Sequence, residues 1–102
     1  MYYQSKLQVI NNGEEDFVKV HHVPSEDRIL QLVSVSDVVA HNIYGYTYHM
    51  LDKRKRSGEI CFRDNRGNPV KRSKTSYVDL KELAGTEAPP EAVIVTKRRD
   101  YV

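Results

Sequence analysis

Residues 3–23 have the sequence YQSKLQVINNGEEDFVKVHHV, and this stretch decides the expected fold. Across residues 3–9 the side chains alternate in character with a period of two, as expected of a half-buried strand. The Asn-Asn-Gly sequence at 11–13 contains residues that tolerate positive φ, and β-branched side chains resume over residues 17–23. The pattern predicts a β-hairpin.

Strands are also expected further along the chain. Arg28–Val35 is rich in β-branched residues, which favour a strand over a helix. Residues 36–42 fit either a short capped helix or a continuation of that strand. Tyr44, Tyr46 and Tyr48 fall at alternate positions, which indicates a strand with an aromatic row on one face.

The second half of the chain contains more turns. Residues 53–58 include no apolar side chain and are expected to form an exposed loop, followed by a short strand over residues 59–63. Residues 64–69 give the densest turn signal of the sequence. Capping-type spacing and an apolar stripe predict a two-turn helix over residues 76–85. Residues 92–96 predict a final strand with a central or well-covered position.

These elements predict one strand-rich α+β domain over residues 1–102. About six short antiparallel strands would form a sheet or a small barrel that carries one or two short helices. No apolar run approaches the roughly 20 residues of a membrane helix. The N-terminus has no apolar signal region, so a cytoplasmic protein is expected. A single cysteine, Cys61, excludes an intrachain disulfide and a zinc site built from cysteines.

Charge is distributed unevenly along the chain. Residues 1–52 hold three basic and seven acidic side chains, residues 53–74 nine basic and two acidic, and residues 75–102 four basic and five acidic. The net charge of +2 therefore conceals a strongly basic middle. Such asymmetry favours a function in which this segment contacts an anionic partner.

The leading hypothesis is a non-catalytic module that binds RNA or single-stranded DNA. Lysines and arginines would contact phosphates while exposed tyrosines stack on bases. The residues expected to form this site are Lys53, Arg54, Lys55, Arg56, Arg63, Arg66, Lys71, Arg72, Lys74, Tyr44, Tyr46 and Tyr48. The alternative structural interpretation is a solvated basic loop beside tyrosines that pack in the sheet. The same residues would also suit a phosphorylated small ligand, or a nuclear-localisation signal in a eukaryotic cell.

A second hypothesis is a small regulator or inhibitor, such as one encoded by a phage or another mobile element, that docks on a larger protein. Its basic segment would face an acidic protein surface. Acidic clusters at Glu14–Asp16 and Glu26–Asp27 lie in two expected turns. If both turns lie at one end of the sheet, they would form a second docking pole. Acidic turns also serve simply to keep a sheet soluble. Free strand edges would permit a homo-oligomer.

A third hypothesis is a metal-independent ribonuclease with His41 and His49 as general base and acid. Nothing in their spacing brings the two histidines together, so no catalytic residue is assigned and an enzyme is not expected. His21 and His22 would point to opposite faces of a strand, which argues against a metal site. No cofactor is expected.

Overall fold

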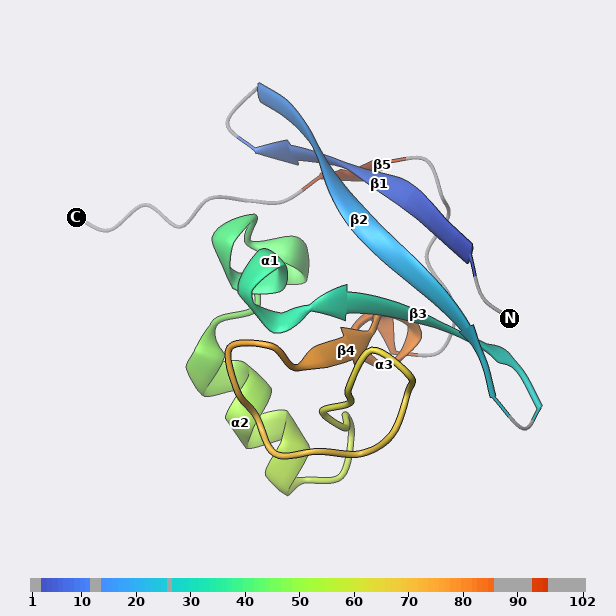
Figure 1. Cartoon of the computed structure of the whole chain (residues 1–102). Coiled ribbons are helices and arrows are strands. Elements are labelled where there is room, and N and C mark those ends of the chain that lie inside the picture. Colours follow the sequence, from blue (N-terminus) through green and yellow to red (C-terminus); the bar gives the residue numbers. More distant parts are fainter. Residues whose placement is uncertain (1–2, 12–13, 26, 86–92, 96–102) are drawn as a thin grey trace.

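The computed structural model describes residues 3–11, 14–25, 27–85 and 93–95. Its elements (Figure 1) are β1 (Tyr3–Asn11), β2 (Glu14–Pro24), β3 (Ile29–Ser34), α1 (Val35–Ala40), the 3-10 helix η1 (Ile43–Gly45), α2 (Tyr48–Arg56), β4 (Tyr77–Asp79), α3 (Leu80–Ala84) and β5 (Val93–Val95). The expected α+β class is confirmed. No helix within the described ranges is long and apolar enough to cross a bilayer.

The strands form one sheet in the order β4-β3-β2-β1-β5. Neighbouring strands are antiparallel except for β5, which runs parallel to β1. Of the two expected architectures, a sheet or a small barrel, the described residues form the sheet. It has five strands in place of about six, one of which is parallel, and β4 and β5 lie at its two ends. The strand expected at residues 92–96 is present as β5, but it lies at the end of the sheet and not in its centre.

The hairpin expected from residues 3–23 is confirmed. β1 and β2 pair without interruption from Tyr3 opposite His22 to Asn11 opposite Glu14, while residues 12 and 13 of the turn lie outside the described residues. Alternate side chains on one face enter the core, namely Leu7, Val9, Val18 and Val20. Burying each such side chain stabilises the fold by about 1.5–3 kcal/mol, so the alternation determines which face meets the helices.

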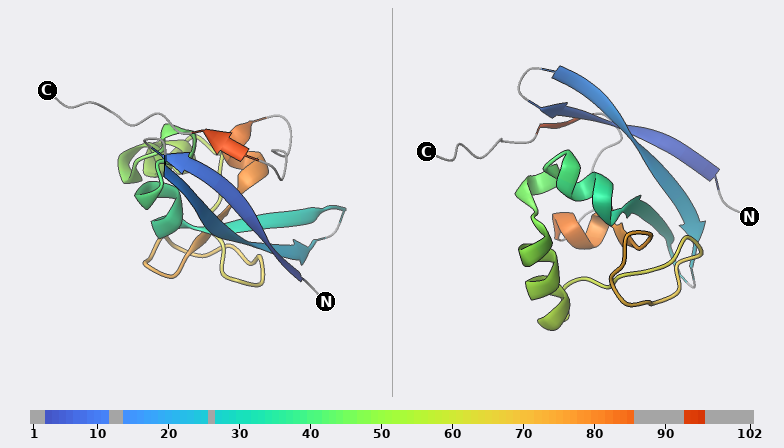
Figure 2. Two further views of the ribbon diagram at one scale, coloured as in Figure 1. Left: turned by 90° about the horizontal axis from the view of Figure 1, so that it is seen from above. Right: turned by 60° about the vertical axis from the view of Figure 1, so that its left-hand side comes forward.

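The helix α1 begins directly after β3 because Ser34 caps it. The Ser34 hydroxyl accepts a hydrogen bond from the backbone N–H of Asp37 at 3.1 Å. Of the two alternatives for residues 36–42, the helix is therefore confirmed, although it begins at Val35. Both Val35 and Val38 are buried in the main core, so α1 covers the inner face of the sheet. Figure 2 shows the helices gathered on this side.

The strand expected over residues 59–63 is wrong as a continuous element. Arg63 forms isolated antiparallel bridges to Pro69 and to Tyr77. Phe62 is nevertheless fully buried. The segment turns at Asp64 immediately after the bridges, so too few residues stay in register to extend a ladder.

The two-turn helix expected over residues 76–85 is shorter than predicted. Val78 instead pairs with Val33 in β4, and helix α3 begins only at Leu80. Pairing with the sheet buries Val78 fully, and a β-branched side chain suits a strand better than a helix. The helix ends, as expected, at Gly85, where φ is 105°.

A turn covers the outer face of the sheet along β3. Val23, Leu30 and Leu32 form a second apolar cluster on that face. Gly67 packs directly against it, since a Cβ at Gly67 would lie 2.9 Å from Leu30 Cδ1, and its φ is +91°. The turn expected at residues 64–69 is therefore confirmed and requires glycine at this position for two reasons.

The acidic cluster Glu14–Asp16 and the described residue of the other cluster, Asp27, lie at opposite ends of β2. Glu14–Asp16 includes the first residues of this strand, whereas Asp27 follows its last residue, Pro24, and Glu26 lies outside the described residues. An 11-residue strand separates them by roughly 30 Å or more at about 3.3 Å per residue. The expected grouping at one end of the sheet is wrong, because successive turns of a three-stranded meander alternate between its ends (Figure 1).

Candidate functional site

The basic residues Lys53–Arg56 form the last turn of α2 and not a loop. Thr47 begins this helix, since its hydroxyl accepts a hydrogen bond from the backbone N–H of Met50 at 3.3 Å. Leu51 is fully buried and anchors the helix to the core. Four cations near the helix C-terminus are favourable because the backbone carbonyls give that end a partial negative charge. The loop expected over residues 53–58 is therefore wrong for residues 53–56, which are helical, while Ser57 and Gly58 form the exposed turn that follows.

A second basic stretch, Lys71–Lys74, lies beside α2. Arg72 joins the two: its Nε and Nη2 donate to Asp52 Oδ1 and Oδ2 at 2.7 and 3.2 Å. The same guanidinium lies 5.2 Å from the centre of the Tyr48 ring, a cation–π distance. The ion pair and the ring contact hold the loop against the helix although Arg72 and Asp52 are 20 residues apart.

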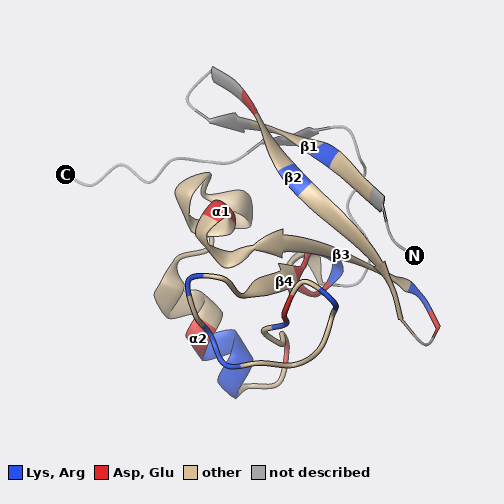
Figure 3. Ribbon diagram, in the orientation of Figure 1, with Lys and Arg blue, Asp and Glu red and all other residues tan. Residues whose placement is uncertain are grey.

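These two stretches make one surface, which Figure 3 shows as blue segments on α2 and the neighbouring loop. We call it the α2 basic surface, and it consists of Lys53, Arg54, Lys55, Arg56, Lys71, Arg72 and Lys74. Arg54 pairs with Glu59 at 3.2 Å and lies 5.5 Å from the Tyr46 ring centre, while Arg72 pairs with Asp52. The other five side chains are exposed and have no carboxylate partner among the residues described. Their charge is available to a ligand.

Arg63 and Arg66 lie apart from this surface. Arg63 donates from Nη2 to Glu82 Oε2 and from Nη1 to the carbonyl oxygen of Gly67, both at 3.1 Å, and is mostly buried. Its side chain therefore ties the turn at 64–69 to α3. Arg66 belongs to that turn, which packs on the outer face of the sheet through Gly67. Only seven of the nine expected cations are brought together.

The expected row of tyrosines is wrong. Asn42 and Tyr44 adopt positive φ values of 52° and 53°, which bend the chain between α1 and α2 and exclude a strand there. Tyr46 is 3% exposed and its hydroxyl donates to the carbonyl oxygen of Leu83 at 3.2 Å. Tyr44 and Tyr48 are 37% and 43% exposed but belong to η1 and α2. Tyr46 is a core residue, and only Tyr48 contacts a residue of the basic surface from an exposed position.

His41, one of the two histidines of the ribonuclease hypothesis, holds the hairpin to α1. His41 Nε2 lies 2.9 Å from Asp16 Oδ2, and its Nδ1 lies 3.1 Å from the carbonyl oxygen of Asp37. Two acceptors suit a ring with protons on both nitrogens. Partial burial alone would lower the pKa of His41, but the hydrogen bonds to Asp16 and Asp37 raise it above the ordinary value. Both nitrogens are occupied, so His41 is poorly suited to act as a general base.

The remaining histidines form no recognisable site. His49 is exposed in the first turn of α2, and His22 is buried with a hydrogen bond to Ser5. Within the described part of the chain, no group of three or more His, Cys, Asp or Glu side chains is placed to hold a metal ion. The contact between His41 and Asp16 spans 25 residues, so no local pattern could have predicted it.

Comparison with protein-family models, with curated proteins and with solved structures found no match for this chain.

Proposed function

We propose that this protein is a non-catalytic nucleic-acid-binding module whose α2 basic surface contacts the phosphate backbone of RNA or single-stranded DNA. The observation that carries the proposal is a set of five exposed cations on one helix turn and one loop, none of which pairs with a carboxylate in the part of the chain that the structure describes. A polyanion gains affinity from each such contact by releasing condensed counterions. A neutral partner would gain no affinity from counterion release at this surface.

The geometry supports backbone contact more than base recognition. Arg72 is already bidentate to Asp52 and covers part of the Tyr48 ring, so this tyrosine supports the loop. Tyr46 is withdrawn into the core. The surface therefore offers charges with few groups that would distinguish bases, and we expect weak dependence on sequence.

The test is fluorescence anisotropy with labelled single-stranded RNA, single-stranded DNA and duplex DNA between about 50 and 200 mM salt. If all five cations contact phosphates, the plot of log affinity against log salt should have a slope of about −3.5 on single strands, since each contact contributes about −0.7. Absence of binding at the lowest salt, or affinity that does not change with salt, would contradict the proposal.

Two variants with the same change in net charge locate the site. The double variant Lys55→Gln with Arg56→Gln removes two exposed charges from α2, whereas Lys81→Glu changes the charge by the same amount on α3. We expect the first to weaken binding at least tenfold at low salt and to reduce the slope by about 1.4. Lys81→Glu should stay within about twofold of the unmodified protein. Equal losses in both would mean that net charge, and not this surface, is responsible.

A further inference from the structure

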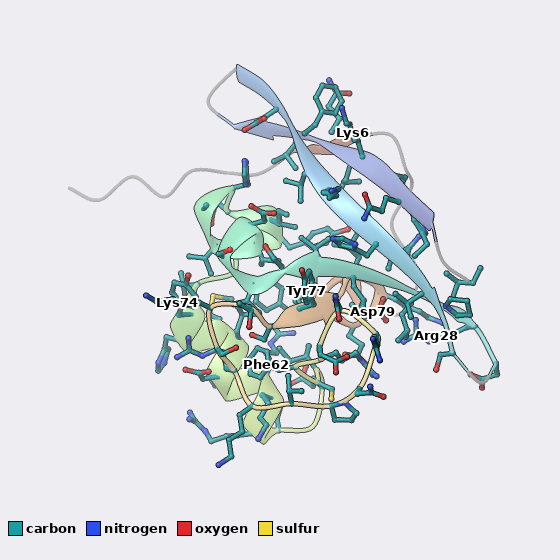
Figure 4. The ribbon with its side chains drawn as sticks, viewed as in Figure 1. Lys6, Arg28, Phe62, Lys74, Tyr77 and Asp79 are labelled. Atoms are coloured by element: carbon teal, nitrogen blue, oxygen red, sulfur yellow. The ribbon has the colours of Figure 1, made fainter. Side chains whose placement is uncertain are left out.

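The outward face of the β1–β2 hairpin carries a second group of exposed residues. Leu7 and Val9 on β1 and Val18 and Val20 on β2 enter the core, so the residues that alternate with them along each strand face away from it. The register sets Lys6 directly opposite Lys19, Gln8 opposite Phe17 and Gln4 opposite His21. Figure 4 shows Lys6 on the side of β1 away from the helices.

Phe17 is the most exposed large apolar residue in the described part of the chain, at 55%. Lys6 and Lys19 are exposed as well, and neither forms an ion pair with a carboxylate whose side chain the structure describes; the side chains of Glu14 and Glu15 on β2 are not among these. The neighbouring acid, Asp16, is opposite Val9 and bonds to His41 on the inner side. The outer face therefore combines an exposed aromatic ring, that of Phe17, with the two exposed cations Lys6 and Lys19.

This open area has a definite boundary. His21 meets the edge of Tyr77 with ring centres 5.3 Å apart, and beyond it Val23 is buried under the turn at 64–69. The outer face along β3 is thus covered by the chain itself, while the part along β1 and β2 is not covered by any described segment. Figure 4 places Lys74, on the α2 basic surface, on another side of the molecule from Lys6.

The pairing of Lys6 with Lys19 indicates what this face would bind. Cross-strand partners have Cβ atoms about 4.5–5.5 Å apart, and like charges at that distance destabilise a sheet. A bound anion relieves this repulsion. Phe17, two positions from Lys19 on the same face, adds a ring on which a flat group can stack. Phosphates flanking a flat, unpaired base are the chemistry of single-stranded nucleic acid, whereas a duplex conceals the faces of its bases.

We propose that the outer face of the β1–β2 hairpin is a second contact site for single-stranded nucleic acid, in which Phe17 stacks on a base and Lys6 and Lys19 contact flanking phosphates. The inference deepens the proposed function and rests on it: the α2 basic surface supplies backbone affinity, and the hairpin distinguishes single strands from duplexes.

The experiment compares Phe17→Ala with Ile29→Ala, which truncates another exposed apolar residue, 49% exposed on β3. The ligands are a labelled uridine-only RNA, an abasic single strand of equal length and a DNA duplex. Phe17→Ala should weaken binding to the RNA about tenfold, with binding to the abasic strand and the duplex within twofold and the salt slope unchanged. Phe17→Tyr should restore the affinity. Ile29→Ala should bind all three as the unmodified protein does.

The charges are tested separately with the double variant Lys6→Gln and Lys19→Gln. If both surfaces contact phosphates, the unmodified protein should show a slope of about −4.9 on the RNA, in place of the slope of about −3.5 expected of the α2 basic surface alone. In the double variant the magnitude of this slope should fall by about 1.4, and the thermal stability should not fall, because the like-charge pair is removed. If the RNA binds and the α2 variant weakens it while Phe17→Ala and the lysine variant behave like Ile29→Ala, only the hairpin site is refuted. If the unmodified protein binds no ligand at low salt, both proposals are refuted.

Discussion

Asp79→Ala removes a fully buried carboxylate that connects three segments of the chain. Its Oδ1 accepts a hydrogen bond from the backbone N–H of Gln31 at 3.0 Å, and its Oδ2 forms an ion pair with Arg28 (labelled in Figure 4). The pairing of β3 with β4 ends at Leu32 opposite Asp79, so the backbone N–H of Gln31 has no partner on β4. The Asp79 carboxylate accepts its hydrogen bond instead. Loss of Asp79 therefore leaves a backbone donor without its partner.

The size of the effect follows from these contacts. A hydrogen bond to a charged acceptor contributes about 1.5–3 kcal/mol, and removing one partner of a fully buried ion pair costs about 3–5 kcal/mol. Arg28 retains 29% exposure and lies 4.0 Å from Glu82, so it can recover solvent and another carboxylate. We therefore expect Asp79→Ala to lower the free energy of unfolding by about 3 kcal/mol. Asp79→Asn keeps an acceptor for Gln31 and should lower it by about 2 kcal/mol.

Urea denaturation followed by tyrosine fluorescence and circular dichroism measures both variants. The free energy of unfolding of a small protein falls by about 1–3 kcal/mol for each 1 M of urea. A loss of about 3 kcal/mol in Asp79→Ala should therefore lower the urea concentration at the unfolding midpoint by at least about 1 M. The matched control is Asp52→Asn, which breaks the exposed pair with Arg72 and should cost less than about 1 kcal/mol. If Asp79→Ala is no more destabilising than the control, the argument from its buried contacts is wrong.

Three further predictions concern single residues. Gly67→Ala should lower stability by about 1–3 kcal/mol in thermal unfolding, because the added Cβ would lie 2.9 Å from Leu30 Cδ1 at a φ of +91°; an unchanged melting temperature would contradict this. Thr47→Ala should remove the N-cap of α2 and cost about 1 kcal/mol, which urea titration would detect. For His41, folding raises the pKa above 6.5, so the folded state binds the proton more tightly than the unfolded state. The stabilising contact with Asp16 is then present near pH 6 and is lost as the pH rises through the raised pKa. Urea titrations of the unmodified protein and His41→Gln should differ most below pH 6.5 and converge as the pH rises past the raised pKa of His41; a difference that grows with pH would refute the assignment.

Local pattern alone predicted the first three strands. Alternation within residues 3–9 and β-branching within residues 17–23 and 28–35 depend only on neighbouring residues, and each corresponds to a strand of the sheet. The turn at 64–69 was predicted for the same reason, since its Asp, Asn and Gly residues act on the backbone nearest to them.

Residues 44–56 show where local pattern failed. Tyrosines at alternate positions favour a strand by propensity, but the chain takes positive φ at Asn42 and Tyr44 and buries Tyr46 beside Leu83. Leu51, fully buried, and Met50, partly buried against the same core, then hold α2 in place. Propensity is a weak preference of well under 1 kcal/mol per residue, and burial of one large side chain outweighs it.

The candidate site also has a part that the sequence predicts and a part that depends on the tertiary structure. The sequence by itself determined that a basic segment interrupts an otherwise acidic and neutral chain, because the number of charges does not depend on folding. Only the tertiary structure decided which charges remain available: Arg72 is paired with Asp52 and Arg63 with Glu82, across 20 and 19 residues. Such pairing depends on distances in space, since electrostatic attraction weakens with separation regardless of the order of residues along the chain.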